Sequence, residues 1–474
     1  MTMKKIKTDV IVLGAGPGGY AAAFHAAEQG KQVVLVDQGP QLGGVCLNRG
    51  CIPSKALINA TSVMEEAMDS SHRGIAFDKP KIDLKKMVAW KNNIVKTLAS
   101  GIEQLASKRK VEVVLGKAHF ESATLIRIEL EKGQVFYEFD TAIIAVGSRP
   151  ALPAAFDLGS QRIMSSTEAL ELANIPKSLL VIGGGYIGME LGTVYANLGS
   201  QITVVEAMDS ILTGADPDLI RPVMKKAQEK FHDILLATKV LDLKTEDKHI
   251  KVTMQGPDQK KVTAKFEKVL VSIGRTPNSH DLGLVDSGVK CDEHGFIVVN
   301  EYQQTSVENI YAIGDIAGGT LLAHKASKEA KIAVDHICGE AVSNKDLIIP
   351  AVVFTDPELA WVGLTEAEAK QKGLDVNVAK FPWTASGKAL AHDRTDGLTK
   401  LILEPETDRV LGVGIVGIHA GDLISEGALA VEMGATAEDL ALTVHPHPTL
   451  SETVMEAAES FYGHSAHVIS VKKS

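Results

Sequence analysis

Cysteine is scarce in this sequence, with four residues among 474. Cys291 and Cys338 stand alone, so they do not supply the closely spaced ligands that a structural zinc site needs. A long chain without a secretory leader does not depend on disulfide cross-links for stability. Zinc binding and a purely structural disulfide are therefore the weaker interpretations of the remaining pair, Cys46 and Cys51.

Other features are missing as well. No run of 18 uncharged apolar residues occurs, which argues against a membrane-spanning helix. Residues 1–8 lack the apolar core of a signal peptide and the character of a transit peptide, so we expect a cytoplasmic protein. Basic residues number 49 against 59 acidic ones, and the net charge of −10 argues against binding nucleic acid or an anionic membrane.

The two neighbouring cysteines lie within residues 43–55 in the pattern Cys-x4-Cys. Five residues along a regular helix rotate a side chain by about 140° from the first, so the two sulfurs would not meet on such a helix. Gly50 permits a distorted backbone, and Pro53 prevents a regular hydrogen-bond ladder from continuing through it. A pair that meets only on a distorted turn indicates a redox-active dithiol, provided that an electron carrier lies nearby.

Such a carrier is predicted by residues 9–37, which read strand, glycine turn, helix and strand and end in the acidic residue Asp37. This is the dinucleotide-binding fingerprint in its required context. The glycines allow the tight turn, the approach of a pyrophosphate and close packing of helix on strand. They are Gly14, Gly16 and Gly19.

The same pattern returns 169 residues later, at residues 180–206, and ends at Glu206. Residues 142–150 are likewise echoed at 269–277. Two such units predict two bound dinucleotides. Glu206 suits the ribose hydroxyls of NAD, and residues 207–210 contain no Arg or Lys for the extra phosphate of NADP. Taken alone, Glu206 is also compatible with an ordinary solvated acid at the end of a strand.

The rest of the chain has a different sequence pattern. Residues 309–315 form one more strand that ends in Gly-Asp, whereas the region after Pro350 has no nucleotide signature. That region ends in His445-Pro446-His447-Pro448-Thr449-Leu450-Ser451-Glu452 and a helical stretch.

Together these motifs resemble, in order and over essentially the whole chain, the dihydrolipoyl dehydrogenases of the class I pyridine nucleotide-disulphide oxidoreductase family. The resemblance implies an α/β protein with two Rossmann-like dinucleotide-binding domains and a C-terminal α+β interface domain. It divides the chain into an FAD-binding domain (1–148), an NAD-binding domain (149–276), a central domain that completes the FAD site (277–348) and a dimerisation domain (349–474). It also implies a homodimer that reoxidises dihydrolipoyl groups carried by the acyltransferase (E2) of 2-oxoacid dehydrogenase complexes.

The resemblance implies cofactor-binding residues in both units. Those for FAD are Gly14, Gly16, Gly19, Asp37, Lys55, the backbone around Ala118, Asp315 and Ala323. Those for NAD are Gly183, Gly184, Gly185, Tyr186, Ile187, Gly188, Glu206, Val240 and Gly274. Lys55 and Glu190 are expected to form an ion pair beside the flavin; the plain alternative for both is a helix-surface charge.

The resemblance also implies the catalytic roles. Cys46 would exchange with the substrate, Cys51 would face the flavin, His447 would act as the base, and Glu452 would orient it. The base of one subunit would serve the disulfide of the other. His445 stays a structural residue by this interpretation.

Two residues depart from the family pattern, Arg49 and Pro446. We expect that a cation at position 49 favours the thiolate form of the dithiol, although a solvated Arg that points away is an equal alternative. Four rival functions are weaker. A glutathione-type reductase would need basic residues for NADPH, a mercuric reductase a C-terminal cysteine pair, and a transhydrogenase would lack the disulfide. A non-catalytic scaffold would have no need of both cysteines, His447 and Glu452.

Overall fold

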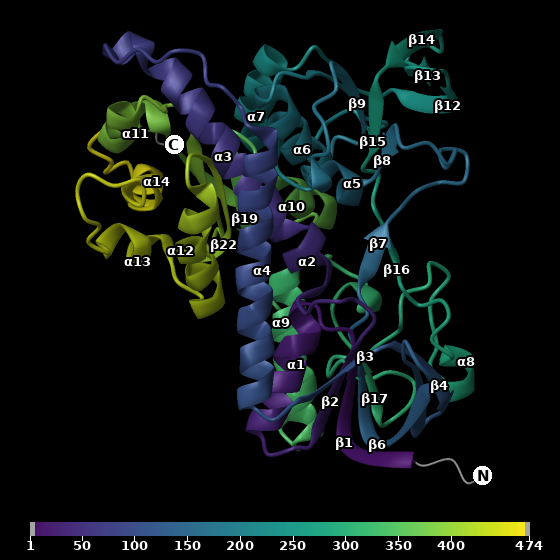
Figure 1. Ribbon diagram of the computed structural model, residues 1–474. Coiled ribbons are helices and arrows are strands. Elements are labelled where there is room, and N and C mark those ends of the chain that lie inside the picture. The colour runs from purple at the N-terminus through teal and green to yellow at the C-terminus, as the bar shows by residue number, and fades with distance from the viewer. Residues whose placement is uncertain (1–4, 470–474) are drawn as a thin grey trace.

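The computed structural model describes residues 5–469 and contains three sheet-based units (Figure 1). The first unit, at the bottom of Figure 1, is a seven-stranded sheet in the order β3-β2-β1-β6-β5-β4, with β17 paired to β6. Its strands are β1 (Lys5–Leu13), β2 (Val33–Asp37), β3 (Glu112–Leu115), β4 (Lys117–Ser122), β5 (Leu125–Glu129), β6 (Gln134–Ile144) and β17 (Ile310–Ala312). Because β17 comes from residues 277–348, that segment completes the first sheet.

Helices cover one face of this sheet. Alanines of α1 (Pro17–Glu28) pack against α4 (Leu84–Lys108), α9 (Ala323–Ile337) and the inner residues of β1. The other face of β1 is equally buried, under residues of β4, β5 and the 282–297 segment. Burial on both faces explains the unbroken apolar run at the end of β1, since parallel strands in such sheets lie between two layers.

The second unit repeats the plan with five parallel strands in the order β11-β10-β9-β15-β8. They are β8 (Ile163–Met164), β9 (Ser178–Ile182), β10 (Gln201–Val205), β11 (Asp233–Leu235) and β15 (Lys268–Val271), with helices α5 (Ser166–Glu171), α6 (Tyr186–Asn197) and α7 (Pro217–Lys230). An antiparallel sheet extends from it: β12 (Lys239–Thr245), β13 (Ile250–Gln255) and β14 (Lys261–Phe266).

The chain enters and leaves the second unit along one two-stranded link. β7 (Ser148–Pro150) pairs antiparallel with β16 (Arg275–Pro277), and Figure 1 shows this pair between the two units. The second unit is thus inserted into the first.

The third unit is an antiparallel sheet in the order β18-β19-β22-β21-β20 with helices packed on it. Its strands are β18 (Ala351–Val353), β19 (Glu358–Gly363), β20 (Asn377–Pro382), β21 (Leu398–Leu403) and β22 (Val410–Gly417). Its helices are α10 (Glu366–Lys372), α11 (Gly387–His392), α12 (Ala420–Met433), α13 (Ala437–Leu442) and α14 (Glu452–Tyr462). The predicted fold class, two Rossmann-like units and an α+β unit, is confirmed.

Within residues 5–469, every helix is too short or too polar to span a bilayer. The helices that carry the cysteines, α2 (Gly44–Arg49) and α3 (Cys51–Asp69), lie between the first two units, where α3 packs on α6.

Candidate active site

The glycine turn after β1 brings backbone atoms too close together for any side chain. Gly14 has φ +98°, and a Cβ there would lie 2.4 Å from the carbonyl oxygen of Ala145. A Cβ on Gly19 would lie 1.7 Å from the oxygen of Gly14. The fingerprint glycines therefore let α1 start directly at the end of β1, with its first N–H groups turned toward the adjoining cavity, as phosphate binding requires.

The acid at the end of β2 fixes this turn. Asp37 Oδ2 accepts a hydrogen bond from the Ala15 N–H (2.6 Å), and Oδ1 accepts one from the Gly39 N–H (2.7 Å). The carboxylate is thus held at the edge of the cavity, where its remaining lone pairs can accept ribose hydroxyls.

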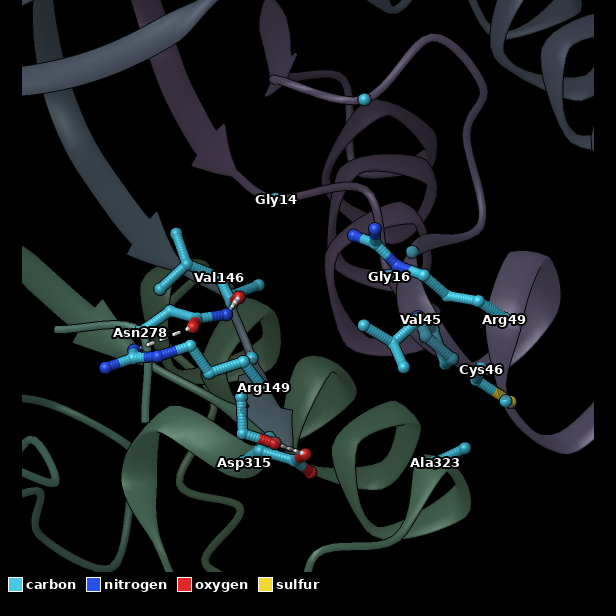
Figure 2. A pocket seen from close by; sticks show the side chains of 18 of the residues that line it. Gly14, Gly16, Val45, Cys46, Arg49, Val146, Arg149, Asn278, Asp315 and Ala323 are labelled. Carbon is cyan, nitrogen blue, oxygen red and sulfur yellow. Dashed lines mark hydrogen bonds between the residues drawn. The ribbon is translucent and has the colours of Figure 1, made fainter. Parts of the chain in front are cut away.

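A cavity of about 820 Å³ extends from this turn to the cysteines, and Figure 2 shows its walls. This volume has room for a dinucleotide. Most of the residues expected around FAD line it. They are Gly14, Gly16, Asp37, Lys55, Ala118, Asp315 and Ala323. The same cavity is also lined by both cysteines, by Glu190 and by two residues expected around NAD, Tyr186 and Ile187. Gly19 does not line the cavity; it lies in the first turn of α1, packed against Gly14.

The two cysteines meet across a break between two helices. α2 ends at Arg49, Gly50 has φ −147° and ψ −116°, and α3 begins at Cys51. A Cβ on Gly50 would lie 2.8 Å from the Val45 carbonyl oxygen, so this turn needs glycine. Pro53 sits in the first turn of α3, where a missing N–H costs nothing.

Both cysteines are in the thiol form, and they differ in acidity. A hydrogen bond from the Cys46 thiol lowers the pKa of Cys51 to about 7. The positive charge of Lys55 acts in the same direction, whereas burial opposes it. The same hydrogen bond and burial raise the pKa of Cys46. The thiolate therefore forms first on Cys51.

Lys55 and Glu190 are not ordinary surface charges. Lys55 Nζ donates to both carboxylate oxygens of Glu190 (2.7 and 3.0 Å), and Glu190 is 2% exposed. Ser54 Oγ and the Phe354 N–H donate to the same carboxylate, at 3.0 and 3.1 Å. The pair joins α3 of the first unit to α6 of the second at the cavity wall.

His447 and Glu452 form the expected pair in the third unit. His447 Nδ1 lies 2.8 Å from Glu452 Oε1, and Glu452 Oε2 accepts the Thr449 N–H at 2.6 Å. Burial opposes ionisation of Glu452, but these hydrogen bonds outweigh it and lower the pKa of Glu452. A carboxylate at Nδ1 leaves Nε2 as the basic nitrogen, and the His447 side chain is 75% exposed.

The two histidines of this segment differ sharply. His445 is buried, with Nε2 2.6 Å from Glu426 Oε1 and Nδ1 2.8 Å from the Thr443 carbonyl oxygen. Both of its ring nitrogens are occupied, as a structural residue requires. Within one chain, His447 and Glu452 do not line the cavity that holds the cysteines.

The second unit repeats the turn of the first almost atom for atom. Gly183 has φ +104°, and a Cβ there would lie 2.5 Å from the oxygen of Ser272; a Cβ on Gly188 would lie 2.1 Å from the oxygen of Gly183. Glu206 accepts hydrogen bonds from the N–H groups of Gly184 (2.7 Å) and Met208 (2.8 Å).

The other residues expected around NAD are spread along this unit. Gly185 caps the N-terminus of α6, Val240 lies half-buried in β12, and Gly274 has φ +127° before β16. None of them lines the cavity with the cysteines, whereas Tyr186 and Ile187, at the start of α6, do.

Comparison with known families assigns these features. The model of the pyridine nucleotide-disulphide oxidoreductases matches residues 8–330, and that of the dimerisation domain of the same family matches residues 349–458. The chain belongs to this family of disulphide oxidoreductases. The family assignment confirms the predicted enzyme class and the cofactors, FAD and NAD.

Curated relatives of this oxidoreductase are closely similar in sequence. The chain is 47% identical to a dihydrolipoyl dehydrogenase of Haemophilus influenzae, over 97% of this chain and 96% of that protein. It is 45% identical to one of Vibrio cholerae, over 97% of both.

Solved structures agree over the whole fold. LpdA from Mycobacterium tuberculosis has a TM-score of 0.88 and 28% identity, over 95% of this chain and 99% of that one. The Cu(II) complex of the HOCl-induced flavoprotein disulfide reductase RclA from Escherichia coli has a TM-score of 0.86 and 25% identity, over 96% and 99%.

The dimerisation domain of this oxidoreductase presents apolar side chains to solvent. Exposed residues on and after α12 and α13 are Leu429, Met433, Leu442 and Val444. These exposed side chains are consistent with the homodimer that the dimerisation domain implies.

Sequence analysis missed part of the cavity wall. Asp315 accepts a hydrogen bond from Ser148 Oγ and lies 3.5 Å from Arg275 Nε, which also donates to Ser148 Oγ at 2.6 Å. Ser148 and Arg275 both lie in the repeated segments 142–150 and 269–277. The repeat predicted two turns but gave no sign that the β7–β16 pairing would bring their side chains to one carboxylate.

Proposed function

We propose that this chain is a dihydrolipoyl dehydrogenase, which oxidises a dihydrolipoyl group through the Cys46–Cys51 pair and passes the electrons to NAD⁺. The observation that carries the proposal is that Cys46 and Cys51 both lie in the wall of a cavity with room for a dinucleotide. The proposed domain division is the one expected above, with the cavity formed mainly by 1–148 and 277–348 and bordered by the start of α6 in 149–276.

The cavity wall provides groups for each part of an FAD molecule. The turn at Gly14 and Gly16 and the N-terminus of α1 would hold the pyrophosphate, and Asp37 would hold the adenosine ribose. Asp315 and the start of α9 at Ala323 would hold the middle of the molecule, with Lys55 beside the ring. When bound, FAD supplies two-electron transfer between a dithiol and NAD.

Cys46 and Cys51 begin the cycle as a disulfide. A substrate thiolate attacks Cys46 Sγ, breaks the Cys46–Cys51 bond and forms a mixed disulfide, while Cys51 leaves as a thiolate. The lowered pKa of Cys51 makes it a good leaving group. The second substrate thiol then displaces Cys46, so the lipoyl group leaves as a disulfide and the enzyme holds the dithiol.

His447 acts as the general base of this exchange. Its free Nε2 takes the proton from the attacking substrate thiol, and Glu452 stabilises the resulting imidazolium at Nδ1. Because His447 does not line the cavity of its own chain, the proposed base comes from the second subunit of the homodimer. The proposed partner is the lipoyl-bearing acyltransferase of a 2-oxoacid dehydrogenase complex, in a reducing cytoplasm.

The test is anaerobic mixing of the purified flavoprotein with dihydrolipoamide and NAD⁺, with NADH followed by absorbance. We expect NADH to form at one equivalent per dihydrolipoamide, and no NADH from the Cys46→Ser and Cys51→Ser variants. A protein that binds FAD but forms no NADH would exclude the dehydrogenase, and a disulfide reductase like RclA would then be tested with NADH as the donor.

A further inference from the structure

Arg49 is a charged residue of the cavity wall to which the proposed mechanism gives no role. It is the last residue of α2, one turn after Val45, and both side chains line the cavity. Residues four apart lie on the same face of a helix. The face of α2 that carries Val45 and Arg49 is therefore the one that faces the dinucleotide.

The start of α2 lies directly against the phosphate-binding turn. A Cβ on Gly44 would lie 2.6 Å from Gly16 Cα, so the two backbones touch there. Side chains on a helix lean toward its N-terminus, and a long side chain at Arg49 consequently reaches back toward Gly44. Figure 2 shows the guanidinium of Arg49 extending in the direction of Gly16.

The other lysines and arginines of the wall already have partners. Lys55 pairs with Glu190 (2.7 Å), Lys117 with Asp281 (3.4 Å) and Arg275 with Asp315 (3.5 Å). Arg149 lines the cavity as well, and its guanidinium donates to the Pro277 carbonyl oxygen (3.0 Å) and Asn278 Oδ1 (3.2 Å). Within residues 5–469, the Arg49 guanidinium has neither a carboxylate partner nor a hydrogen bond of this kind.

The dithiol does not use this charge. The cation that lowers the pKa of Cys51 is Lys55, after the hydrogen bond from Cys46. The guanidinium of Arg49 extends away from the Cys46 sulfur, toward Gly16 in the glycine turn (Figure 2). The expectation that Arg49 favours the thiolate therefore gains no support from the geometry.

We infer that Arg49 binds the pyrophosphate of FAD, opposite the N-terminus of α1, and so clamps the cofactor from the side of the redox loop. This inference rests on the proposed function, because it needs FAD in this cavity. A guanidinium is planar and always charged, and it binds phosphate oxygens with two hydrogen bonds. Gly16 caps α1 without a side chain, so the pyrophosphate would meet backbone N–H groups on one side and Arg49 on the other.

The test is the rate at which FAD leaves the holoenzyme, followed by the rise in flavin fluorescence. Removing a charge-assisted hydrogen bond to a phosphate should speed release about ten- to a hundredfold in Arg49→Gln. Arg49→Lys keeps the charge but loses the two-pronged geometry, so its rate should fall between the two. Added salt should speed release from the wild type more than from Arg49→Gln.

The matched control is Lys108→Gln, which also removes one positive charge from the first unit but lies exposed at the far end of α4. Its release rate should equal that of the wild type. Equal rates for wild type and Arg49→Gln at low and high salt would overturn the inference. So would an Arg49→Gln protein that releases FAD normally but shows a shifted pH profile of thiol alkylation, since Arg49 would then act on the dithiol.

Failure of this inference is distinguishable from failure of the proposed function. If the wild-type protein binds no flavin, the proposed function is wrong. If it binds flavin and forms NADH, while Arg49→Gln releases FAD at the wild-type rate, only the role of Arg49 is wrong.

Discussion

The two dinucleotide units share one local design and differ in what surrounds it. Asp37 and Glu206 each accept two backbone N–H groups, from residues that correspond after a shift of 169. The first unit, however, is completed by β17 and α9, which close a cavity over the turn. The same turn thus stands in two settings: in the first unit it borders a cavity of about 820 Å³, whereas Gly183, Gly184 and Gly188 of the second unit do not line that cavity.

The largest effect is expected from substitutions that leave both dinucleotide units intact but remove a catalytic group. Cys51→Ser and His447→Gln should each lose at least about a thousandfold in lipoamide activity, because one lacks the disulfide and the other the base. Co-expressed, they form mixed dimers that contain one complete site. About half of the dimers are mixed, so roughly a quarter of full activity should return.

The control for this experiment is proof of mixing, with two tags purified in series. If tagged mixed dimers form and remain inactive, the base acts on the cysteines of its own chain, and the shared site is wrong.

The next largest effect is expected from replacing a glycine in either of the two turns, which should affect a different cofactor in each case. Gly14→Ala and Gly183→Ala both place a Cβ about 2.5 Å from a carbonyl oxygen at a positive φ. Gly14→Ala should purify with little or no flavin, as the ratio of visible to ultraviolet absorbance reports. Gly183→Ala should keep its flavin and raise the KM for NAD⁺ about tenfold or more. If the first unit bound NAD⁺ and the second bound FAD, Gly183→Ala would lose the flavin and Gly14→Ala would raise the KM for NAD⁺.

A smaller effect is expected from the acids at the strand ends. Glu206→Ala, combined with Ala207→Arg and Met208→Arg, should shift kcat/KM from NAD⁺ toward NADP⁺ by about ten- to a hundredfold, since a guanidinium can pair with the additional phosphate. Asp37→Ala should change flavin retention and leave the NAD⁺ to NADP⁺ ratio as it is. Comparable kcat/KM values for both nucleotides in the wild type would contradict the ribose argument.

The smallest effect concerns the ion pair that joins the units. The Lys55 charge helps to lower the pKa of Cys51 to about 7, whereas Glu190 opposes it. Lys55→Met should therefore move the pH profile of thiol alkylation in the reduced enzyme to higher pH, so that less thiolate exists at pH 7. Glu190→Gln should move the profile to lower pH. Shifts in the same direction for both variants would show that packing, and not charge, sets the acidity.

The sequence predicted those parts of the site that depend on local geometry. Gly14, Gly50 and Gly183 occupy positions where a Cβ would overlap backbone. The conformation of each turn was therefore predictable from the glycine at that position. The partners of Glu190 and Asp315 were harder to foresee. Lys55 could be matched to Glu190 only through family resemblance, and the contact of Ser148 with Arg275 depends on a β-pairing between residues about 127 positions apart. No local pattern encodes such a contact.

The position of Arg49 illustrates the same limit. The sequence placed a cation three residues from one cysteine and two from the other, which suggested an effect on the thiols. The lean of the α2 side chains, and the contact of Gly44 with Gly16, instead direct it along the cavity. The short separation in sequence did not predict the contact, because α2 directs the Arg49 side chain away from Cys46.

The β7–β16 link has a consequence for biosynthesis. A ribosome releases residues 1–148 first, but the sheet they form lacks β17 until residues 310–312 have emerged. By then the whole of the inserted unit has left the exit tunnel and, as an independent parallel sheet, can already have folded. The first sheet therefore stays incomplete, and α1 lacks its neighbour α9, until a segment encoded more than 160 codons downstream has been translated. For this polypeptide, the unit whose translation begins first is completed only after the inserted unit.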